Sequence, residues 1–335
     1  MTADVAAEAV SAVAENLGWK AIRHPLADGG EGTKECIASH FTEIWLDSAD
    51  ALSRPQKASY LLDSEGNAAI TAADFIGLEQ LALADRNPMI TTSASLADPL
   101  LDALSRGAKS ITLFVGGVAT VDGGIGMLGA LGANTDLNDF DLTPAIQKFA
   151  GVTLTVATDV SSPLTGPDGA AYLFGPQKGA APEQVTQLEA ALTVIGVKLG
   201  IDPNTPGAGA AGGLGAAFMA LGASRKSGAE EVLRLTRFAE ELQGASLCIT
   251  GEGKVDRGSA HGKTVSAVLE ACRAAGVPCV VLGGTIAGED TADQLRELGA
   301  LDVRSITPDG QPLSEALANG AKNLAATTYE LLSQM

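Results

Sequence analysis

The chain has 335 residues, of which 46% are hydrophobic and 19% charged, and its formal net charge is −18 at pH 7. This length and apolar content suffice for one large or two ordinary domains, while the acidic balance excludes nucleic acid as the expected partner because phosphates would be repelled. No apolar run approaches the roughly 20 residues of a membrane span, and an acid at position 4 is unlike a signal peptide. We therefore expect a cytoplasmic protein.

The first half of the chain predicts a change of architecture near residue 41. Residues 2–17 have helical spacing, with Thr2 as N-cap and Gly18 as the stop, and a short strand over 21–26 leads into an acidic glycine loop. Beyond it, three β-like runs around a turn predict antiparallel pairing and the entry to a second domain; they cover 41–46, 58–62 and 68–71. Helices over 72–83 and 96–107 follow.

Four apolar runs in the remainder each end in glycine or an acid: 110–115, 152–157, 247–249 and 278–282. Buried parallel strands with functional loops at one sheet edge produce this pattern. Tight turns between strand and helix are the alternative explanation for any single one of them. Helices predicted to cover the sheet or pack closely lie over 212–222, 230–243, 290–298 and 314–335.

The stretch from Ser246 to Gly276 indicates strand, loop and helix. Its loop combines glycines with ionisable side chains, as an anion site before a helix N-terminus would, whereas a solvated surface loop is the alternative. The P-loop pattern fails because Arg257 stands where a glycine is required. A second near match, Gly207 to Gly212, spells G-x-G-x-x-G without a preceding strand, which argues against dinucleotide binding.

Two further features bear on possible sites. Lys178 lies in a long connection rich in glycine and proline, where it is either a phosphate contact or an exposed lysine at a loop tip. The four cysteines have no C-x-x-C spacing, and three of them lie in apolar runs where buried thiols are expected; they are Cys36, Cys248, Cys272 and Cys279. Neither a disulfide nor a zinc site is predicted.

Five segments in this order resemble the bacterial glycerate kinase family (type I), which phosphorylates D-glycerate with ATP. They spread over nearly the whole chain and are PLADGGEGT (25–33), GGVATVDGGIGML (116–128), DVSSPLTGPDGAAYLFGPQKGA (159–180), PGAGAAGGLGAA (206–217) and ITGEGKVDRGSAHGKT (249–264). The family's first strand and lysine-bearing loop have no counterpart before the first helix. Val118 and Val121 replace the usual Ser and Asn, and Ser161-Ser162 replaces Asp-Asn, changes that bear on glycerate contacts more than on the fold.

The resemblance implies an α/β protein with two domains. A discontinuous Rossmann- or flavodoxin-like domain with a parallel sheet would comprise 1–40 and 225–335, and an inserted second α/β domain 41–224. The implied reaction gives 2-phosphoglycerate with ATP as co-substrate and Mg²⁺ as cofactor, and the partners would be small molecules. A regulatory binding protein of the same fold and an NAD-dependent enzyme using the Gly207 loop are the alternatives.

The resemblance also implies roles for individual residues. Asp159 and Asp256 would bind the metal or accept the hydroxyl proton, with Lys178 and Lys263 as further catalytic residues. Orientation of the small acid falls to Asp28, Glu31, Thr33, Thr120 and Asp122. Nucleotide and phosphate contacts fall to Gly116, Gly117, Gly251, Glu252, Gly253, Lys254 and His261, the last being equally well a helix N-terminal residue.

Overall fold

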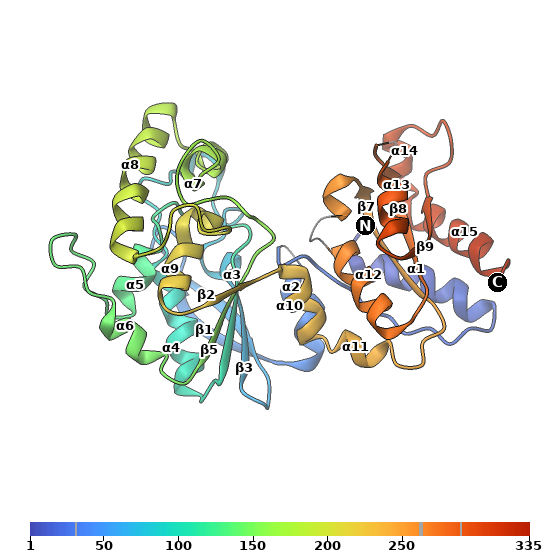
Figure 1. Ribbon diagram of the computed structural model, residues 1–335, viewed down its shortest axis with the longest axis horizontal. Coiled ribbons are helices and arrows are strands. Elements are labelled where there is room, and N and C mark those ends of the chain that lie inside the picture. The colour runs from blue at the N-terminus through green and yellow to red at the C-terminus, as the bar shows by residue number, and fades with distance from the viewer. Residues whose placement is uncertain (31, 261–263, 289) are drawn as a thin grey trace. The chain divides into compact units, whose positions relative to one another are not determined.

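The computed structural model describes residues 1–30, 32–260, 264–288 and 290–335 (Figure 1). It confirms a mixed α/β protein with two separate sheets, one of six strands and one of three. The chain divides into two compact units, 29–228 on the one hand and 1–28 with 229–335 on the other. The sequence placed its domain boundaries at 40/41 and 224/225, and the assignment of an inserted domain stays a prediction.

The unit of residues 29–228 is built on the six-stranded sheet, in the order β1-β2-β3-β4-β5-β6. β1, β2 and β3 pair antiparallel, as predicted from the sequence, and β3 to β6 pair parallel. The strands are β1 (Thr42–Ala49), β2 (Pro55–Leu62), β3 (Asn67–Thr71), β4 (Ser110–Phe114), β5 (Thr153–Ala157) and β6 (Ser224–Lys226). β6, an exposed and charged edge strand, was not predicted from the sequence.

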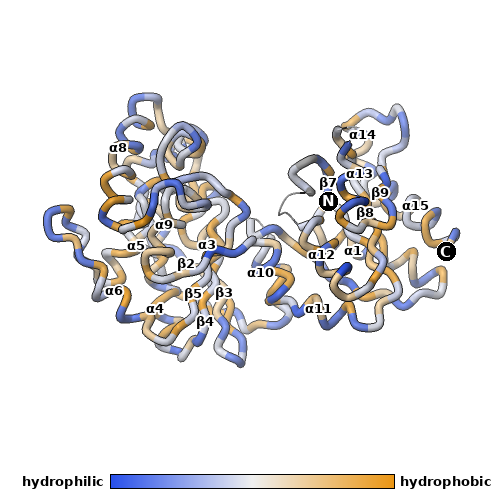
Figure 2. The backbone as a smooth tube through the Cα atoms, in the orientation of Figure 1, coloured by the Kyte–Doolittle hydropathy of each residue, from blue (hydrophilic) through white to orange (hydrophobic). Residues whose placement is uncertain are grey.

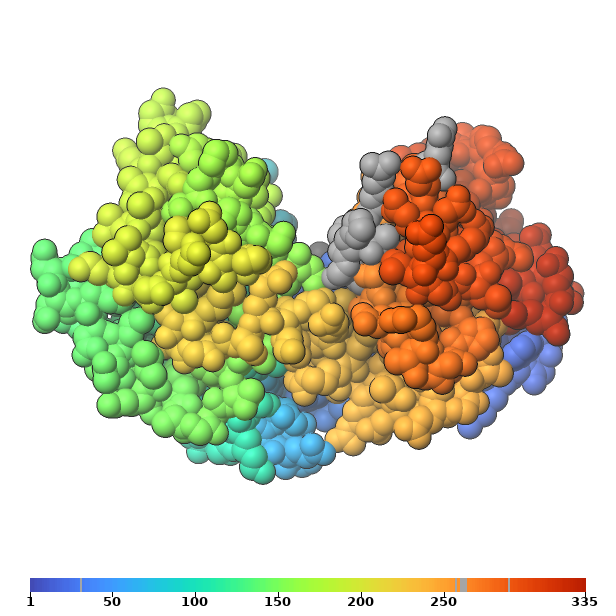
Figure 3. Space-filling view, in the orientation of Figure 1, coloured from blue at the N-terminus to red at the C-terminus, as the bar shows by residue number. Residues whose placement is uncertain are grey.

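Helices connect the parallel strands of this unit, because parallel neighbours need long crossovers. They are α2 (Thr33–Ile37), α3 (Ala72–Ile76), α4 (Ala97–Ser105), α5 (Ile125–Ala130), α6 (Thr143–Lys148), α7 (Ala170–Phe174), α8 (Pro182–Leu199) and α9 (Leu214–Ala220). Short 3₁₀ turns cover Ala38–His40, Leu83–Asp85, Ala94–Leu96, Pro176–Lys178 and Ala210–Gly213. α7 packs beside α8, and the two share one region of the surface (Figure 3).

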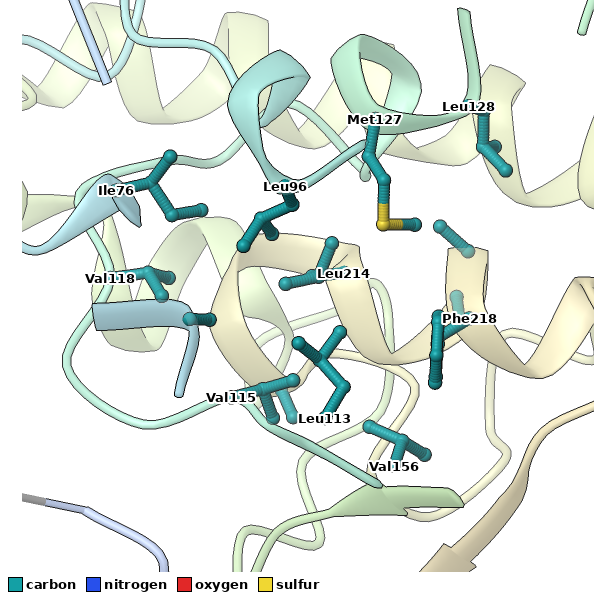
Figure 4. Packing of buried hydrophobic residues seen from close by; sticks show 14 of the residues in the cluster. Ile76, Leu96, Leu113, Val115, Val118, Met127, Leu128, Val156, Leu214 and Phe218 are labelled. Atoms are coloured by element: carbon teal, nitrogen blue, oxygen red, sulfur yellow. The ribbon is translucent and has the colours of Figure 1, made fainter. Parts of the chain in front are cut away.

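The core of this unit lies between the parallel strands and the helices. Hydrophobic residues lie along β4 and β5 and along α4, which packs against β1, β2 and β3 (Figure 2). Leu214 and Phe218 of α9, both fully buried, lie between Met127 of α5 and the strand residues Leu113 and Val156 (Figure 4). Burying side chains of this size contributes roughly 1.5 to 3 kcal/mol each, so the loops at the strand ends are attached to a rigid base.

The helix predicted over 72–83 ends at Ile76, because the chain turns to pair with the loop after β4. Gly77 is extended, with φ −65° and ψ 140°, and forms an isolated bridge with Val118. The Leu78 N–H donates to the Gly117 carbonyl at 2.8 Å. A Cβ at position 77 would lie 2.3 Å from the Ala73 carbonyl, so glycine is needed for this pairing.

The unit of residues 1–28 and 229–335 has a parallel sheet in the order β7-β8-β9. Its strands are β7 (Cys248–Val255), β8 (Cys279–Ile286) and β9 (Ala300–Ser305). Its helices are α1 (Ala3–Asn16), α10 (Gly228–Leu235), α11 (Phe238–Glu241), a 3₁₀ turn (Arg257–Ala260), α12 (Thr264–Ala275), α13 (Thr291–Glu297), α14 (Leu313–Ala318) and α15 (Gly320–Leu332). β9 was not predicted from the sequence.

Successive residues of β8 alternate between two cores, one on each face of this sheet. Cys279 and Val281 belong to the core beneath α12, whereas Val280 and Leu282 belong to the core that includes α15 residues and is contacted by α1. Such alternation is the period of a strand buried on both faces. The predicted N-cap is confirmed, since Thr2 Oγ1 accepts from the Val5 N–H at 3.4 Å.

Two strand predictions in this unit were wrong. Residues 21–26 form no strand: Pro25 has no N–H for a ladder, and Ile22 is 56% exposed. β7 and β8 also continue through the glycines at which the sequence placed their ends. In the part of the chain that the structure describes, no helix combines the length and apolar character that crossing a membrane requires.

Candidate active site

The loops that follow β4 and β5 lie at one edge of the six-stranded sheet. Phe114 and Ala157, the last residues of these parallel strands, are direct partners in the register. Gly116 and Gly117 begin two residues after the end of β4, and Asp159 stands two residues after the end of β5. The carboxyl edge of a parallel sheet is where ligands bind in open α/β folds, so the groups that meet there are candidates for the site.

A third loop, Gly29-Gly30, packs against this edge. A Cβ on Gly116 would lie 3.2 Å from Gly30 Cα, and one on Gly29 would lie 3.0 Å from Gly228 Cα. Gly29 also has φ +92°, which other residues rarely adopt. The fold therefore brings the segments that contain Gly30, Gly116 and Gly228 together, and glycine permits the close approach.

Thr33 follows this loop as the first residue of α2. Its side chain is fully buried, and its Oγ1 has no hydrogen-bond partner within the described residues. Thr120 Oγ1, in the loop after β4, is in the same condition. Buried hydroxyl groups normally have a partner, and these two lie near this sheet edge without one among the described residues.

Asp159 is held by the chain that leaves β6. Its Oδ1 accepts hydrogen bonds from Ser227 Oγ at 2.7 Å and from the Gly228 N–H at 2.9 Å. This carboxylate is thus fixed at the edge formed by β5 and β6. Ser227 was not predicted as a site residue, because it stands 68 positions after Asp159 and no local pattern links the two.

Lys178 lies in the 3₁₀ turn Pro176–Lys178 and is only 3% exposed, so its interpretation as an exposed loop-tip lysine was wrong. Its Nζ donates to the Thr120 carbonyl at 2.8 Å. Burial lowers the pKa of Lys178 from 10.5 to about 7, although the Asp122 carboxylate opposes this change. The ammonium group therefore holds the loop after β4 from its buried side.

Asp122 joins two loops. Its Oδ2 accepts from the Ser93 N–H at 2.8 Å and from Ser93 Oγ at 2.7 Å, and its Oδ1 accepts from the Gly124 N–H at 3.0 Å. Ser93 Oγ in turn accepts from the Met127 N–H at 3.0 Å. Ser93 was not predicted as a site residue, because it stands 29 positions before Asp122 and no local pattern links the two.

A cavity of about 510 Å³ opens beside Asp122. Its size is that of a small-molecule site. The lining combines polar residues with an apolar wall: Thr91, Thr92, Asp122, Gly126 and Thr135, and Ile125, Leu137, Ala191, Val194 and Ile195.

The glycine-rich segment 207–213 packs against the loop after β4 and does not follow a strand. A Cβ on Gly212 would lie 2.1 Å from the Thr120 carbonyl, and one on Gly209 would lie 2.0 Å from the Pro163 carbonyl. The residues before this segment are α8 and turns. A dinucleotide fingerprint requires a strand directly before its glycines. The structure describes all residues between α8 and this segment, and they form no such strand.

A further polar cluster, missed in the sequence, surrounds Lys34. Its Nζ lies 2.9 Å from Ser59 Oγ, 3.1 Å from Asp74 Oδ2 and 3.4 Å from Glu43 Oε1. Burial raises the pKa of Asp74, an effect that the Lys34 ammonium only partly offsets. Asp74 lies on α3, directly after β3, so this pair stands at the same sheet edge as Asp159.

In the other unit the predicted loop from Gly251 is largely strand. Gly251, Glu252 and Lys254 pair with β8, and a Cβ at position 251 would lie 1.9 Å from the Leu282 carbonyl. Gly253 is also a β7 residue. Glycine is needed at position 251 because β7 and β8 approach closely there, and not because the chain turns. The loop at this sheet edge therefore begins at Asp256, after the end of β7.

Asp256 and its neighbours form a compact polar group. Asp256 Oδ1 accepts from the Gly258 N–H at 2.9 Å, and its Oδ2 lies 3.5 Å from Lys254 Nζ. The Asp256 N–H donates to Ser259 Oγ at 2.9 Å, and that hydroxyl donates to Glu252 Oε1. Asp28 belongs to this unit and is exposed. The predicted site residues Glu31, His261 and Lys263 lie outside the described residues.

Comparison with known proteins decides the family. The model of the glycerate kinase family matches residues 1–335. The chain belongs to the glycerate kinase family. It is 35% identical to the Glycerate 2-kinase of Escherichia coli (strain K12), over 90% of this chain and 87% of the relative. It is 34% identical to the Glycerate kinase of Bacillus subtilis (strain 168), over 93% and 87% of the two chains.

A solved structure supports the same assignment. The Salmonella typhimurium LT2 protein named glycerate kinase 2 superimposes with a TM-score of 0.82 at 32% sequence identity, over 100% of this chain and 94% of that one. Within this family pattern, Val118 and Val121 are each 2% exposed and belong to the core. Their apolar side chains are therefore packed in the core of the unit of residues 29–228.

The carboxylates of this protein suit a magnesium ion, because Mg²⁺ does not need a preformed cage of protein ligands. Mg²⁺ is usually bound by one or two carboxylates together with substrate phosphates. Asp159 and Asp256 each present a carboxylate at a sheet edge. Across the described residues, the group of three candidate ligands that lie close together consists of cysteines, whose sulfur atoms Mg²⁺ does not prefer.

Proposed function

We propose that this chain transfers a phosphoryl group from ATP to D-glycerate with Mg²⁺, giving 2-phosphoglycerate, and that it does so in the cytoplasm. Membership of the glycerate kinase family over residues 1–335 supports the substrate and the reaction. The Escherichia coli relative, named Glycerate 2-kinase, supports the position of transfer. The chain would then be a phosphotransferase that acts on an alcohol group of a small organic acid.

One observation supports placing the reaction at the six-stranded sheet. Gly30, Gly116 and Asp159 lie together at the carboxyl edge of β4 and β5. Glycine loops at such an edge let backbone N–H groups approach phosphate oxygens. Mg²⁺, when bound, would supply positive charge that neutralises the charge developing during transfer. Asp159 would hold that ion or accept the proton of the attacking hydroxyl.

The remaining residues would bind and position the two substrates. The free hydroxyls of Thr33 and Thr120 would contact glycerate, together with Asp28 and Glu31. Lys178 would act by holding the Thr120 loop, because its ammonium group is buried behind that loop.

Gly116 and Gly117, in the unit of residues 29–228, would contact phosphate through their backbone N–H groups. In the unit that contains Asp256, a second group of residues would contact nucleotide phosphates. That second group comprises Gly251, Glu252, Gly253, Lys254, His261 and Lys263. The apolar wall beside Asp122 suits the base of the nucleotide, and the threonine side chains suit its ribose hydroxyls.

The experiment is a coupled assay in which enolase consumes 2-phosphoglycerate directly, so that rate and position of transfer are read together. Asp159→Asn should lower kcat by on the order of 10²- to 10⁴-fold, the contribution of a general acid–base group. Asp47→Asn is the matched control, because the Asp47 side chain is 90% exposed and makes only a loose ion pair with Lys57 at 3.8 Å. An Asp159→Asn enzyme as fast as the parent would contradict the assignment of Asp159.

A catalytically impaired binding protein is the second candidate, and the buried Val118 and Val121 favour it. Its signature is ATP binding by the full chain without turnover of glycerate. Restoring the family residues with Val118→Ser and Val121→Asn would then produce activity. If the parent chain turns over glycerate, this candidate is excluded.

A further inference from the structure

Three of the four cysteines converge in the unit of residues 1–28 and 229–335. Cys248 begins β7 and pairs in register with Cys279, which begins β8, while Cys272 lies on α12. Their three Sγ atoms all lie within 4.8 Å of one another. Cys272 and Cys279 are each 1% exposed, and Cys248 is half-buried.

The fold creates this cluster from positions that are far apart in the sequence. The strand register places Cys248 beside Cys279, and both belong to the core beneath α12. The three Sγ atoms lie within 4.8 Å of one another, and the Cys279 thiol also donates to the Val280 carbonyl at 4.0 Å. Valine or alanine side chains could fill this part of the core without any sulfur atom. The three cysteines instead group three sulfur atoms, which are potential metal ligands.

The surroundings restrict the kind of ion. Zinc in protein sites is almost always four-coordinate, with a water as the fourth ligand where the protein supplies only three. Among the described residues no His, Asp, Glu or further Cys completes the group. With Cys272 and Cys279 nearly inaccessible to solvent, a coordinated water has no place at their side of the cluster.

We propose that Cys248, Cys272 and Cys279 form a three-sulfur site for a soft monovalent cation, Cu(I). Thiolate ligands select Cu(I) over hard ions, and Cu(I) accepts three-coordination by sulfur. With metal–sulfur distances of about 2.3 Å, a trigonal site has sulfur atoms about 4.0 Å apart. The observed limit of 4.8 Å therefore requires only small side-chain rotations.

Binding requires no redox step. Each cysteine that ligates as a thiolate loses its S–H proton to solvent, and the copper ion keeps its oxidation state. The half-buried Cys248 marks the side from which the ion would enter. The bound ion would link β7, β8 and α12, so it should stabilise this unit against unfolding. The inference does not depend on the proposed phosphoryl transfer.

The test titrates the reduced full chain with Cu(I) under anaerobic conditions against bathocuproine disulfonate, a coloured Cu(I) chelator. One Cu(I) should bind per chain, with sulfur neighbours at about 2.3 Å in X-ray absorption and a higher midpoint of thermal unfolding. Cys272→Val, which keeps an apolar side chain of similar size, should lower Cu(I) affinity by more than about 100-fold. Cys36→Ala, in the other unit, should leave it unchanged.

Circular dichroism of Cys272→Val must match that of the parent; should this variant not fold, Cys248→Ser at the half-buried position replaces it. Retention of tight Cu(I) binding by the folded variant would overturn the site, as would its loss in Cys36→Ala. Tighter binding of Zn²⁺ than of Cu(I) by the parent would overturn the assignment of the ion. Nitrogen or oxygen neighbours in place of sulfur would do the same.

Discussion

Replacing Lys178 by methionine should change how stability depends on pH. The pKa of Lys178 is lowered by burial from 10.5 to about 7. Between these values the unfolded chain carries a proton that the folded chain has lost, so the free energy of unfolding rises with pH. Below pH 7 Lys178 is protonated in both the folded and the unfolded chain, so the stabilisation that is fully present above pH 10.5 is absent.

The size of the effect follows from one proton. Each pH unit within this window changes the free energy of unfolding by up to about 1.4 kcal/mol. Since the slope is half-developed at the folded pKa, the parent should gain about 2 kcal/mol between pH 7 and pH 9. Lys178→Met lacks this titration, so the difference in stability between parent and variant should shift by that amount in favour of the parent.

The measurement is urea unfolding at pH 7, 8 and 9 in a Trp19→Phe background. Trp45, then the only tryptophan, reports on the unit of residues 29–228. Lys57→Met is the control, because the Lys57 side chain is 76% exposed and should leave the pH dependence unchanged. Parallel stability curves for the parent and Lys178→Met would refute the assignment of a buried lysine that titrates near neutral pH.

Two other substitutions test the packing of the same unit. Gly212→Ala should destabilise it by about 1 to 3 kcal/mol, because its φ is +70° and the new Cβ would lie 2.1 Å from the Thr120 carbonyl. Gly129→Ala on α5, whose new Cβ would have its nearest neighbour at 3.6 Å, is the control in the same unit, and equal urea midpoints for the two variants would contradict this. Asp50→Asn should cost about 1 to 3 kcal/mol at pH 7, because Asp50 Oδ2 accepts from Arg54 Nε at 2.6 Å. Burial raises the pKa of Asp50, but hydrogen bonds from Arg54 lower the pKa by more, so the folded value lies below the unfolded value near 4. The stabilisation by Asp50 is therefore present above the unfolded pKa and is lost as pH falls through the folded pKa. A cost of Asp50→Asn that does not shrink in acid would contradict this.

Periodicity in the sequence predicted the elements that bury a regular face. The helix over 2–17 and the strands over 110–115 and 152–157 are present because their apolar spacing matches the packing that each element makes. The extension of β7 could not be predicted in this way. Its glycines and charges have the composition of a loop, and only the approach of β8, where a Cβ on Gly284 would lie 2.3 Å from the Gly253 carbonyl, explains them.

Side-chain environments depended on contacts that a local pattern does not contain. Glycine and proline surround Lys178 in the sequence whether it is buried or exposed, and only the fold places its Nζ on Thr120. Ser93 is 29 residues from its partner Asp122, and Ser227 lies farther still from Asp159. The segments that carry the family resemblance were identifiable, whereas Ser93 and Ser227, which help to hold them in place, were not.

The Thr120 carbonyl has a consequence for variation in this loop. Lys178 donates a hydrogen bond to that oxygen, and Gly212 lies so close that a Cβ there would reach it. Substitutions at these two positions act on one atom, so their effects on stability should not add, unlike those of distant sites. Libraries that vary position 178 and position 212 independently would miss compensating pairs, which is why the two positions should be varied together.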